Sequence, residues 1–201
     1  MELLGEAVSV NTMDSIENSG ATEKAMLKFI KRCGFDFDKV RSDLIPKDFV
    51  RFQFDSARKR MSTIIKGPEG ERIHIKGASE IVLESCTHYL DTNGQKCPID
   101  DQMKNLIMDI IKSYAKNALR TIAFAYKEVE PGLGGPGHEE MVEGSKIAVV
   151  EETGNCLIAI AGIMDIIREE VPEAVSKCNF AGVRVRMVTG DNKITAIAIA
   201  K

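Results

Sequence analysis

The alternation of hydrophobic and polar residues predicts a β-hairpin in the first half of the chain. Two segments with β-branched residues, 61–65 and 72–76, are joined by the polar, glycine-containing segment 66–71. The first strand is entered through Phe52 and Phe54, which alternate with polar residues as in a strand with one buried face. On this pattern alone, both rings could be ordinary core residues.

A period of 3.6 residues predicts helices on both sides of this hairpin. Residues 22–33 carry an apolar stripe, with Thr22 as the expected N-cap and Gly34 as the expected stop signal. Residues 100–118 carry a longer stripe. Ser79 is placed to cap a short helix directly after the hairpin.

Further strands and loops follow from the remaining pattern. Three apolar segments predict strands, at residues 119–126, 147–150 and 156–163. Three segments that are polar, or rich in glycine and proline, predict connections or loosely held ends, at residues 1–20, 35–48 and 130–145.

The C-terminal part of the chain changes to the order helix, strand, helix. A helix is expected over 172–181 and a strand over 183–188, and the loop after this strand contains Thr189 and Asp191. This order predicts a Rossmann-like α/β fragment, in which functional groups lie at the carboxyl ends of strands. Because the sheet would be incomplete, we expect the chain to be a piece of a longer protein.

Composition and charge narrow the class of protein. With 201 residues, 44% of them hydrophobic and 28% charged, the chain has the composition of a soluble globular protein with room for one large domain or one domain and part of another. A net charge of −3 predicts no general attraction to nucleic acid or to an anionic membrane. The longest apolar run, 156–164, is about half of a membrane span, and the N-terminus lacks the features of a secretory signal. Five cysteines without a Cys-x-x-Cys pair indicate free thiols in a reducing compartment.

A dense basic cluster gives the hairpin candidate chemistry. Arg58, Lys59 and Arg60 follow Phe54, and Lys76 returns on the partner strand. An aromatic ring beside several cations can hold a flat base and its phosphates. The alternative is that the three basic residues form a solvated rim.

Five motifs in order resemble those of P-type cation-transporting ATPases. They are Gly20-Ala21-Thr22-Glu23, the segment from Phe54 to Ser62, Lys76-Gly77-Ala78, Leu119-Arg120-Thr121-Ile122-Ala123, and the segment from Met187 to Asn192. The resemblance covers roughly residues 20–201. The amino-acid sequences of the motifs are most similar to those of calcium pumps of the plasma-membrane, calmodulin-regulated branch.

The resemblance implies a domain organisation and a fold. Residues 21–164 would form an α+β nucleotide-binding domain, a twisted antiparallel sheet flanked by helices, preceded by a flexible segment over 1–20. Residues 165–201 would be part of a phosphorylation domain of the haloacid dehalogenase type, which is α/β and Rossmann-like. The strand at 156–163 would then be the returning strand of the nucleotide domain.

The resemblance also implies roles in binding the adenine base of ATP. Phe54 would stack on the base, Ile122 would contact its apolar face, and Glu23 would accept a hydrogen bond from its amino group. From the residues alone, Glu23 has another explanation, since a carboxylate in the first turn of a helix is favoured by the helix dipole.

Other residues would surround the phosphates and the base. Lys59 and Lys76 would line the pocket, Arg120 would contact a phosphate, and Gly77 and Ala78 would let the ligand approach the backbone. A tight turn would also explain Gly77, and an edge position would explain Arg120. Near the C-terminus, Thr189, Gly190 and Asp191 would couple nucleotide and Mg²⁺ to the phosphorylation site. The complete expected set is Glu23, Phe54, Ser56, Lys59, Lys76, Gly77, Ala78, Arg120, Ile122, Thr189, Gly190 and Asp191.

The chain departs from the family pattern in three places. It contains no Asp-Lys-Thr-Gly-Thr segment, which supplies the phosphorylated aspartate, and no Gly-Asp-Gly-x-Asn-Asp segment, which helps to hold Mg²⁺. We therefore expect no catalytic residue, no metal ligand and no phosphoryl transfer in this chain. Asp165-Ile166-Ile167-Arg168 stands where the family has a proline-containing hinge, so the expected hinge is less stiff.

The expected function is that of the cytosolic ATP-binding domain of a P-type pump, with calcium as the expected ion. Its expected partners are ATP with Mg²⁺ and the phosphorylation, actuator and transmembrane domains of the same pump, at the cytosolic face of a membrane. We expect the fragment itself to be soluble and monomeric, with no nucleic-acid partner. One alternative is an interaction module that keeps the fold without binding nucleotide. Another is a free-standing phosphatase, but its Asp-x-Asp motif matches only Asp36-Phe37-Asp38, which lies in a predicted connection.

Overall fold

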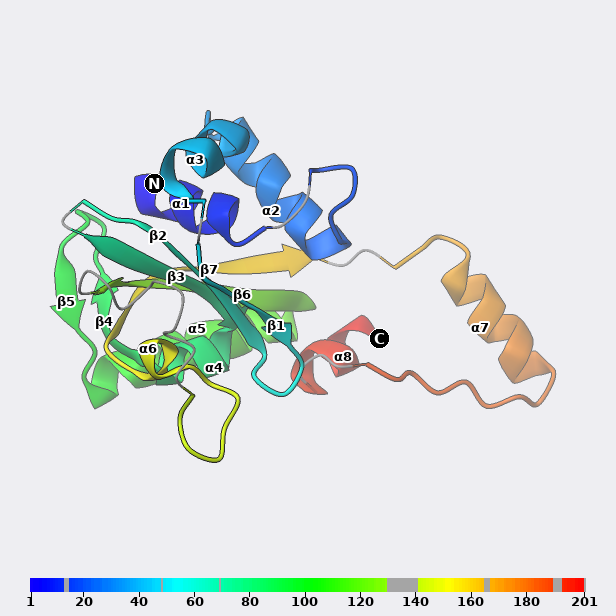
Figure 1. Ribbon diagram of the computed structural model, residues 1–201. Coiled ribbons are helices and arrows are strands. Elements are labelled where there is room, and N and C mark those ends of the chain that lie inside the picture. Colours follow the sequence, from blue (N-terminus) through cyan, green and yellow to red (C-terminus); the bar gives the residue numbers. More distant parts are fainter. Residues whose placement is uncertain are drawn as a thin grey trace.

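The computed structural model describes residues 1–12, 15–47, 49–68, 70–129, 141–164, 167–189 and 193–200. Its centre is a seven-stranded sheet (Figure 1). The strands are β1 (Arg51–Asp55), β2 (Arg60–Lys66), β3 (Glu71–Ala78), β4 (Cys86–Leu90), β5 (Lys96–Pro98), β6 (Leu119–Val129) and β7 (Asn155–Met164). The spatial order is β1-β2-β3-β6-β7-β4-β5. The predicted hairpin is β2 and β3, which pair from Arg60 with Gly77 to Lys66 with Glu71.

The sheet is mixed, which corrects the expectation of a wholly antiparallel one. Strands β4 and β7 are parallel, and every other neighbouring pair is antiparallel. The short helix α4 (Ser79–Glu84) carries the chain from β3 past β6 and β7 to the far side of β7. Because β3 and β7 run in the same direction, this crossover makes β4 parallel to both. The expected α+β class is confirmed.

Helices cover both faces of the sheet (Figure 1). On one face lie α1 (Glu2–Val10), α2 (Ala21–Arg32) and α3 (Phe37–Leu44), and on the other lie α4, α5 (Asp101–Lys116) and α6 (Val149–Glu152). The alternation along β3 separates two cores. Ile73 and Ile75 pack with residues of α4 and α5, whereas His74 and Lys76 reach acidic side chains of α1 and α2.

The expectation of a loosely held end over residues 1–20 is wrong for residues 2–10, which form α1. Buried side chains of α1 share a core with α2 and the sheet. Arg41 and Arg51 each donate a 2.8 Å hydrogen bond to a carbonyl at the C-terminal end of α1. These partners are distant in sequence, and α1 has no side-chain N-cap, so the local pattern carried little signal for this helix.

The predictions for three other helical segments have mixed outcomes. Gly20, not Thr22, is the N-cap of α2, although Gly34 follows the helix at a φ of +88° as expected. The predicted connection 35–48 contains α3, whose first turn is capped by Asp36. The expected helix 100–118 is confirmed as α5, with Asp100 as its N-cap.

Two predicted segments on the C-terminal side of β6 have different outcomes. The strand expected at 147–150 is wrong, because Val149 already begins α6. The strand expected at 156–163 is confirmed as β7. Most of the predicted loop 130–145 lies outside the described residues, as do Asp165 and Ile166 of the expected hinge.

The Rossmann-like fragment is not confirmed. Helix α7 (Val171–Phe180) forms where it was expected, and a further helix, α8 (Lys193–Ile199), follows. The strand expected at 183–188 is wrong, because 183–189 is exposed and carries no strand. A strand needs a neighbour to pair with, and none of the seven described strands pairs with this segment. Among the described residues, no helix has the length and hydrophobicity to cross a bilayer.

Candidate functional site

A tight turn joins β1 to β2 and carries two of the predicted site residues. The carboxylate of Asp55 accepts hydrogen bonds from the backbone N–H groups of Ala57 at 2.8 Å and Arg58 at 3.2 Å. These bonds lower the pKa of Asp55. The backbone N–H of Lys59 donates to the carbonyl of Asp55 at 2.7 Å, and Lys59 has a φ of +52°. The turn therefore has a defined conformation, with Ser56 and Lys59 on its exposed side.

Gly77 is required by the packing of this turn against β3. A Cβ atom at Gly77 would lie 2.5 Å from the carbonyl oxygen of Lys59, and the same carbonyl accepts a 2.9 Å hydrogen bond from the N–H of Ala78. The close approach of two backbones thus explains the glycine without a ligand. Any role of Gly77 and Ala78 in admitting a ligand stays a prediction.

The two phenylalanines of β1 have different environments. Phe52 is 7% exposed and belongs to the core on the α4 and α5 face, whereas the ring of Phe54 is 61% exposed. An irregularity in the pairing of β1 with β2 between Phe52 and Asp55 breaks the alternation. The prediction that both could be core residues is therefore right for Phe52 and wrong for Phe54.

Glu23 and Lys76 form an ion pair between α2 and β3. The ammonium group of Lys76 donates to the carboxylate of Glu23 at 2.6 Å, and both side chains are largely buried. Burial lowers the pKa of Lys76; Glu23 opposes this shift, and the charges of Arg51 and Arg41 add to it. Within the described ranges, the charges of Lys76 and Arg51 both interact with the carboxylate of Glu23, and a cluster of cations can attract an anionic ligand.

The start of β6 completes the group. Arg120 donates a hydrogen bond to the hydroxyl of Thr22 in the first turn of α2, at 3.3 Å. Ile122 lies directly opposite Ala78 in the pairing of β3 with β6. The structure thus brings together the first turn of α2, the end of β3 and the start of β6, which hold Glu23, Lys76 and Arg120.

The basic cluster that follows Phe54 divides between two environments. Arg58 and Arg60 are 7% and 5% exposed and turn toward the carboxyl and carbonyl groups of the buried Glu151 in α6. Only Lys59 is exposed. Both interpretations of the cluster, phosphate ligands or solvated rim, are therefore wrong for the two arginines. Sequence reasoning missed Glu151 because its partner lies 93 positions away.

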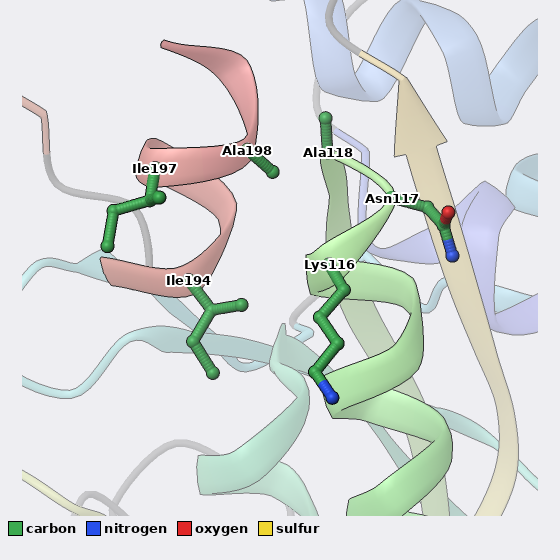
Figure 2. A pocket seen from close by; sticks show the side chains of 6 residues that line it. All are labelled: Lys116, Asn117, Ala118, Ile194, Ile197 and Ala198. Carbon is green, nitrogen blue, oxygen red and sulfur yellow. The ribbon is translucent and has the colours of Figure 1, made fainter. Parts of the chain in front are cut away.

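The remaining predicted residues lie near the C-terminus. Thr189 lies at the end of the exposed segment 183–189, and Gly190 and Asp191 lie outside the described residues. A separate hollow lies between α8 and the end of α5, with Ile194, Ile197 and Ala198 facing residues 116–118 (Figure 2). It contains none of the predicted site residues. Within the described ranges, no three His, Cys, Asp or Glu side chains gather as metal ligands would.

Comparison with known proteins identifies the family. The family model described as "P-type ATPase, cytoplasmic domain N" matches residues 7–170. The chain belongs to this family. The match includes the β1–β2 turn, the Glu23–Lys76 pair, Arg120 and Glu151, so the group of site residues lies within the N domain.

Relatives of this N domain carry the names of calcium-transporting ATPases. "Calcium-transporting ATPase PAT1" of Dictyostelium discoideum is 39% identical over 98% of the chain. "Plasma membrane calcium-transporting ATPase 3" of Homo sapiens is 39% identical over the whole chain, and "Calcium-transporting ATPase 4, plasma membrane-type" of Arabidopsis thaliana is 40% identical over 90% of it. The chain spans only 16% to 17% of the length of these three relatives.

Proposed function

We propose that this N domain binds ATP, with its Mg²⁺, at the group formed by Phe54, Lys59, Lys76, Glu23 and Arg120. The carrying observation is the exposed side chain of Phe54 at the end of β1, beside a turn that presents Lys59 and whose Lys59 carbonyl is hydrogen-bonded to Ala78 at the end of β3. An exposed aromatic ring gives a purine a surface for stacking, which contributes about 1–3 kcal/mol in nucleic-acid complexes.

The polar groups of the site match the rest of the ligand. Glu23 can accept a hydrogen bond from an adenine amino group, and Lys76, Lys59 and Arg120 supply positive charge for the phosphates. In the free domain, Glu23 and Lys76 already pair with each other. ATP must compete with this pair, so the affinity is expected to be modest, near a dissociation constant of about 1 mM or roughly −4 kcal/mol.

The wider proposal concerns the protein of which this N domain is a part. We infer a P-type ATPase that hydrolyses ATP to move Ca²⁺ across a membrane, because the relatives are named as calcium-transporting ATPases. The chain itself contains no Asp-Lys-Thr-Gly-Thr segment, so it would bind ATP without turning it over. Its partners would be the phosphorylation, actuator and transmembrane domains, with the N domain at the cytosolic face. Thr189, Gly190 and Asp191 would act there with the phosphorylation site.

The test is a calorimetric or NMR titration with ATP, with and without Mg²⁺, on the wild type and on Phe54→Ala. Saturable binding without turnover is expected, and Phe54→Ala should weaken it at least about fivefold, since about 1 kcal/mol of stacking is lost. Phe180→Ala is the matched control, because Phe180 is 97% exposed on α7 and should bind like the wild type. A folded wild type that fails to bind ATP at several millimolar would contradict the proposal and favour the interaction module.

A further inference from the structure

The side chain of Glu151 makes a buried network beneath the β1–β2 turn. Glu151 is fully buried in α6, on the face of the sheet opposite α2. Its carboxylate accepts hydrogen bonds from Arg58 at 2.5 Å, from the hydroxyl of Ser62 at 2.6 Å and from the backbone N–H of Ala148 at 3.1 Å. Three donors thus hold one carboxylate, and two of them belong to the turn or the strand after it.

Arg58 connects Glu151 to strand β1, which contains Phe54. Its guanidinium also donates to the carbonyl of Gln53 at 2.6 Å and lies over the ring of Phe52, 6.0 Å from its centroid. Gln53 is the residue before Phe54, and Lys59 is the residue after Arg58. Arg58 also donates a weak hydrogen bond to the carbonyl of Arg60 at 3.4 Å. The side chain of Arg58 therefore contacts the backbone before and after the turn.

A second contact links the chain just before Glu151 to the β1–β2 turn, and this contact lies at the surface. Lys146 forms an ion pair with the carboxylate of Asp55 at 3.4 Å. The same carboxylate accepts the hydrogen bonds from the backbone of the turn. The surface pair is exposed and contributes little energy. The buried pair differs, because removing one partner leaves the other charge in a nonpolar interior without compensation.

We propose that Glu151 is a positioning residue for the nucleotide. Through Arg58 it fixes the conformation of residues 53–60, and so it sets where the exposed ring of Phe54 and the ammonium group of Lys59 can meet ATP. Because Glu151 is fully buried, it would act on the ligand only through the turn. The inference rests on the proposed nucleotide site. The effect of Glu151 on the conformation of residues 53–60 can be measured without ATP.

The test compares Glu151→Gln with two controls in the full chain. Glu128→Gln makes the same chemical change at the Arg72 pair, at the other end of β3. Ile111→Ala weakens the core on the same face of the sheet, away from the turn. For each variant, the amide NMR shifts and hydrogen exchange of residues 54–60 and 78 are measured without ligand, and the ATP dissociation constant is measured at a temperature where all are folded.

Glu151→Gln is expected to shift the 54–60 amides, to speed exchange of the Ala78 N–H and to raise the ATP dissociation constant on the order of tenfold. Both controls should leave these amides and the dissociation constant within about twofold of the wild type. A folded Glu151→Gln with wild-type amides at 54–60 would overturn the proposal. Shifted amides with unchanged ATP affinity would also overturn it, whereas failure of the wild type to bind ATP would contradict the proposed function alone.

A second variant keeps the test decisive if Glu151→Gln does not fold. The double substitution Arg58→Met with Glu151→Leu replaces the buried charges with apolar groups of similar size, which proteins often accept without loss of stability. It removes the hydrogen bond to the Gln53 carbonyl. A stable double variant with weakened ATP binding supports positioning by this network, and a stable one that binds ATP like the wild type refutes it.

Discussion

At the scale of single residues, the candidate site depends on the close approach of the β1–β2 turn to β3, which leaves no room for a side chain at residue 77. The carbonyl of Lys59 occupies the space where a Cβ of residue 77 would lie, and Lys59 itself has a positive φ. A non-glycine residue in this conformation carries strain, which the hydrogen bonds of its N–H and carbonyl groups to Asp55 and Ala78 offset. The position of Lys59 therefore depends on Gly77.

Gly77→Ala is expected to lower the free energy of unfolding by about 1–3 kcal/mol, because β3 and the turn must move apart to admit the methyl group. Gly20→Ala is the control: no atom lies within 4 Å of the added Cβ, so a change below about 1 kcal/mol is expected there. Chemical denaturation measures both. Equal stability of Gly77→Ala and the wild type would contradict the packing described for the turn.

The sequence predicted a set of site residues, which stays a prediction, but it predicted little of their environments. The resemblance singled out Phe54, Glu23, Lys76 and Arg120, and the structure brings the last three together. The pattern could not separate Phe54 from Phe52, since the irregularity that exposes one ring depends on pairing with β2. It also could not separate Lys59 from its two arginine neighbours, because their burial depends on Glu151.

At the scale of elements, α1 is held to the sheet by charged and polar groups as well as by its apolar face. Glu6 of α1 accepts a 2.9 Å hydrogen bond from Arg72, and its carboxylate lies 3.3 Å from Nε2 of His74 on β3. His74 is fully buried. Burial lowers the pKa of His74, which Glu6 opposes only in part, so the imidazole is neutral in the folded domain at neutral pH.

This burial predicts a loss of stability in mild acid. The unfolded chain protonates His74 near its ordinary pKa of 6.5, whereas the folded domain does so only at lower pH. The free energy of unfolding should therefore fall as the pH decreases below about 6.5, by up to about 1.4 kcal/mol per pH unit, until the folded pKa is reached. His74→Phe should reduce this slope between about pH 6.5 and 5.5 in denaturation curves. An unchanged slope would show that His74 is not its source.

Sequence analysis missed helices α1 and α6 because their stability is supplied from far along the chain. Helix α1 is fixed by Arg41, Arg51 and Arg72, and α6 contains only four residues around a carboxylate bound by the β1–β2 turn. Helix α5 was predicted from its own 3.6-residue periodicity, and strands β2, β3, β6 and β7 were predicted from their apolar or β-branched segments. The parallel placement of β4 depends on a six-residue crossover helix, which local patterns do not reveal.

At the scale of the whole molecule, the N domain and the C-terminal residues differ in their packing. Residues 2–164 contain both cores and all seven strands of the described chain. Helix α7 has no buried residue, and Figure 1 shows it standing away from the sheet. The division into a nucleotide domain at 21–164 and a partial phosphorylation domain at 165–201 stays a prediction, and the α1 packing extends the first unit toward the N-terminus.

The central claim is that ATP binds between the first turn of α2 and the β1–β3 strand ends. The most direct measurement is an NMR shift map of the wild-type chain during titration with ATP and Mg²⁺. We expect saturable shifts at the ring of Phe54, at the amides of Lys59, Lys76 and Ala78 and at the methyl groups of Ile122, and no shifts at the hollow beside α8. Saturable shifts confined to the α8 hollow, or no shifts at several millimolar ATP, would contradict the claim.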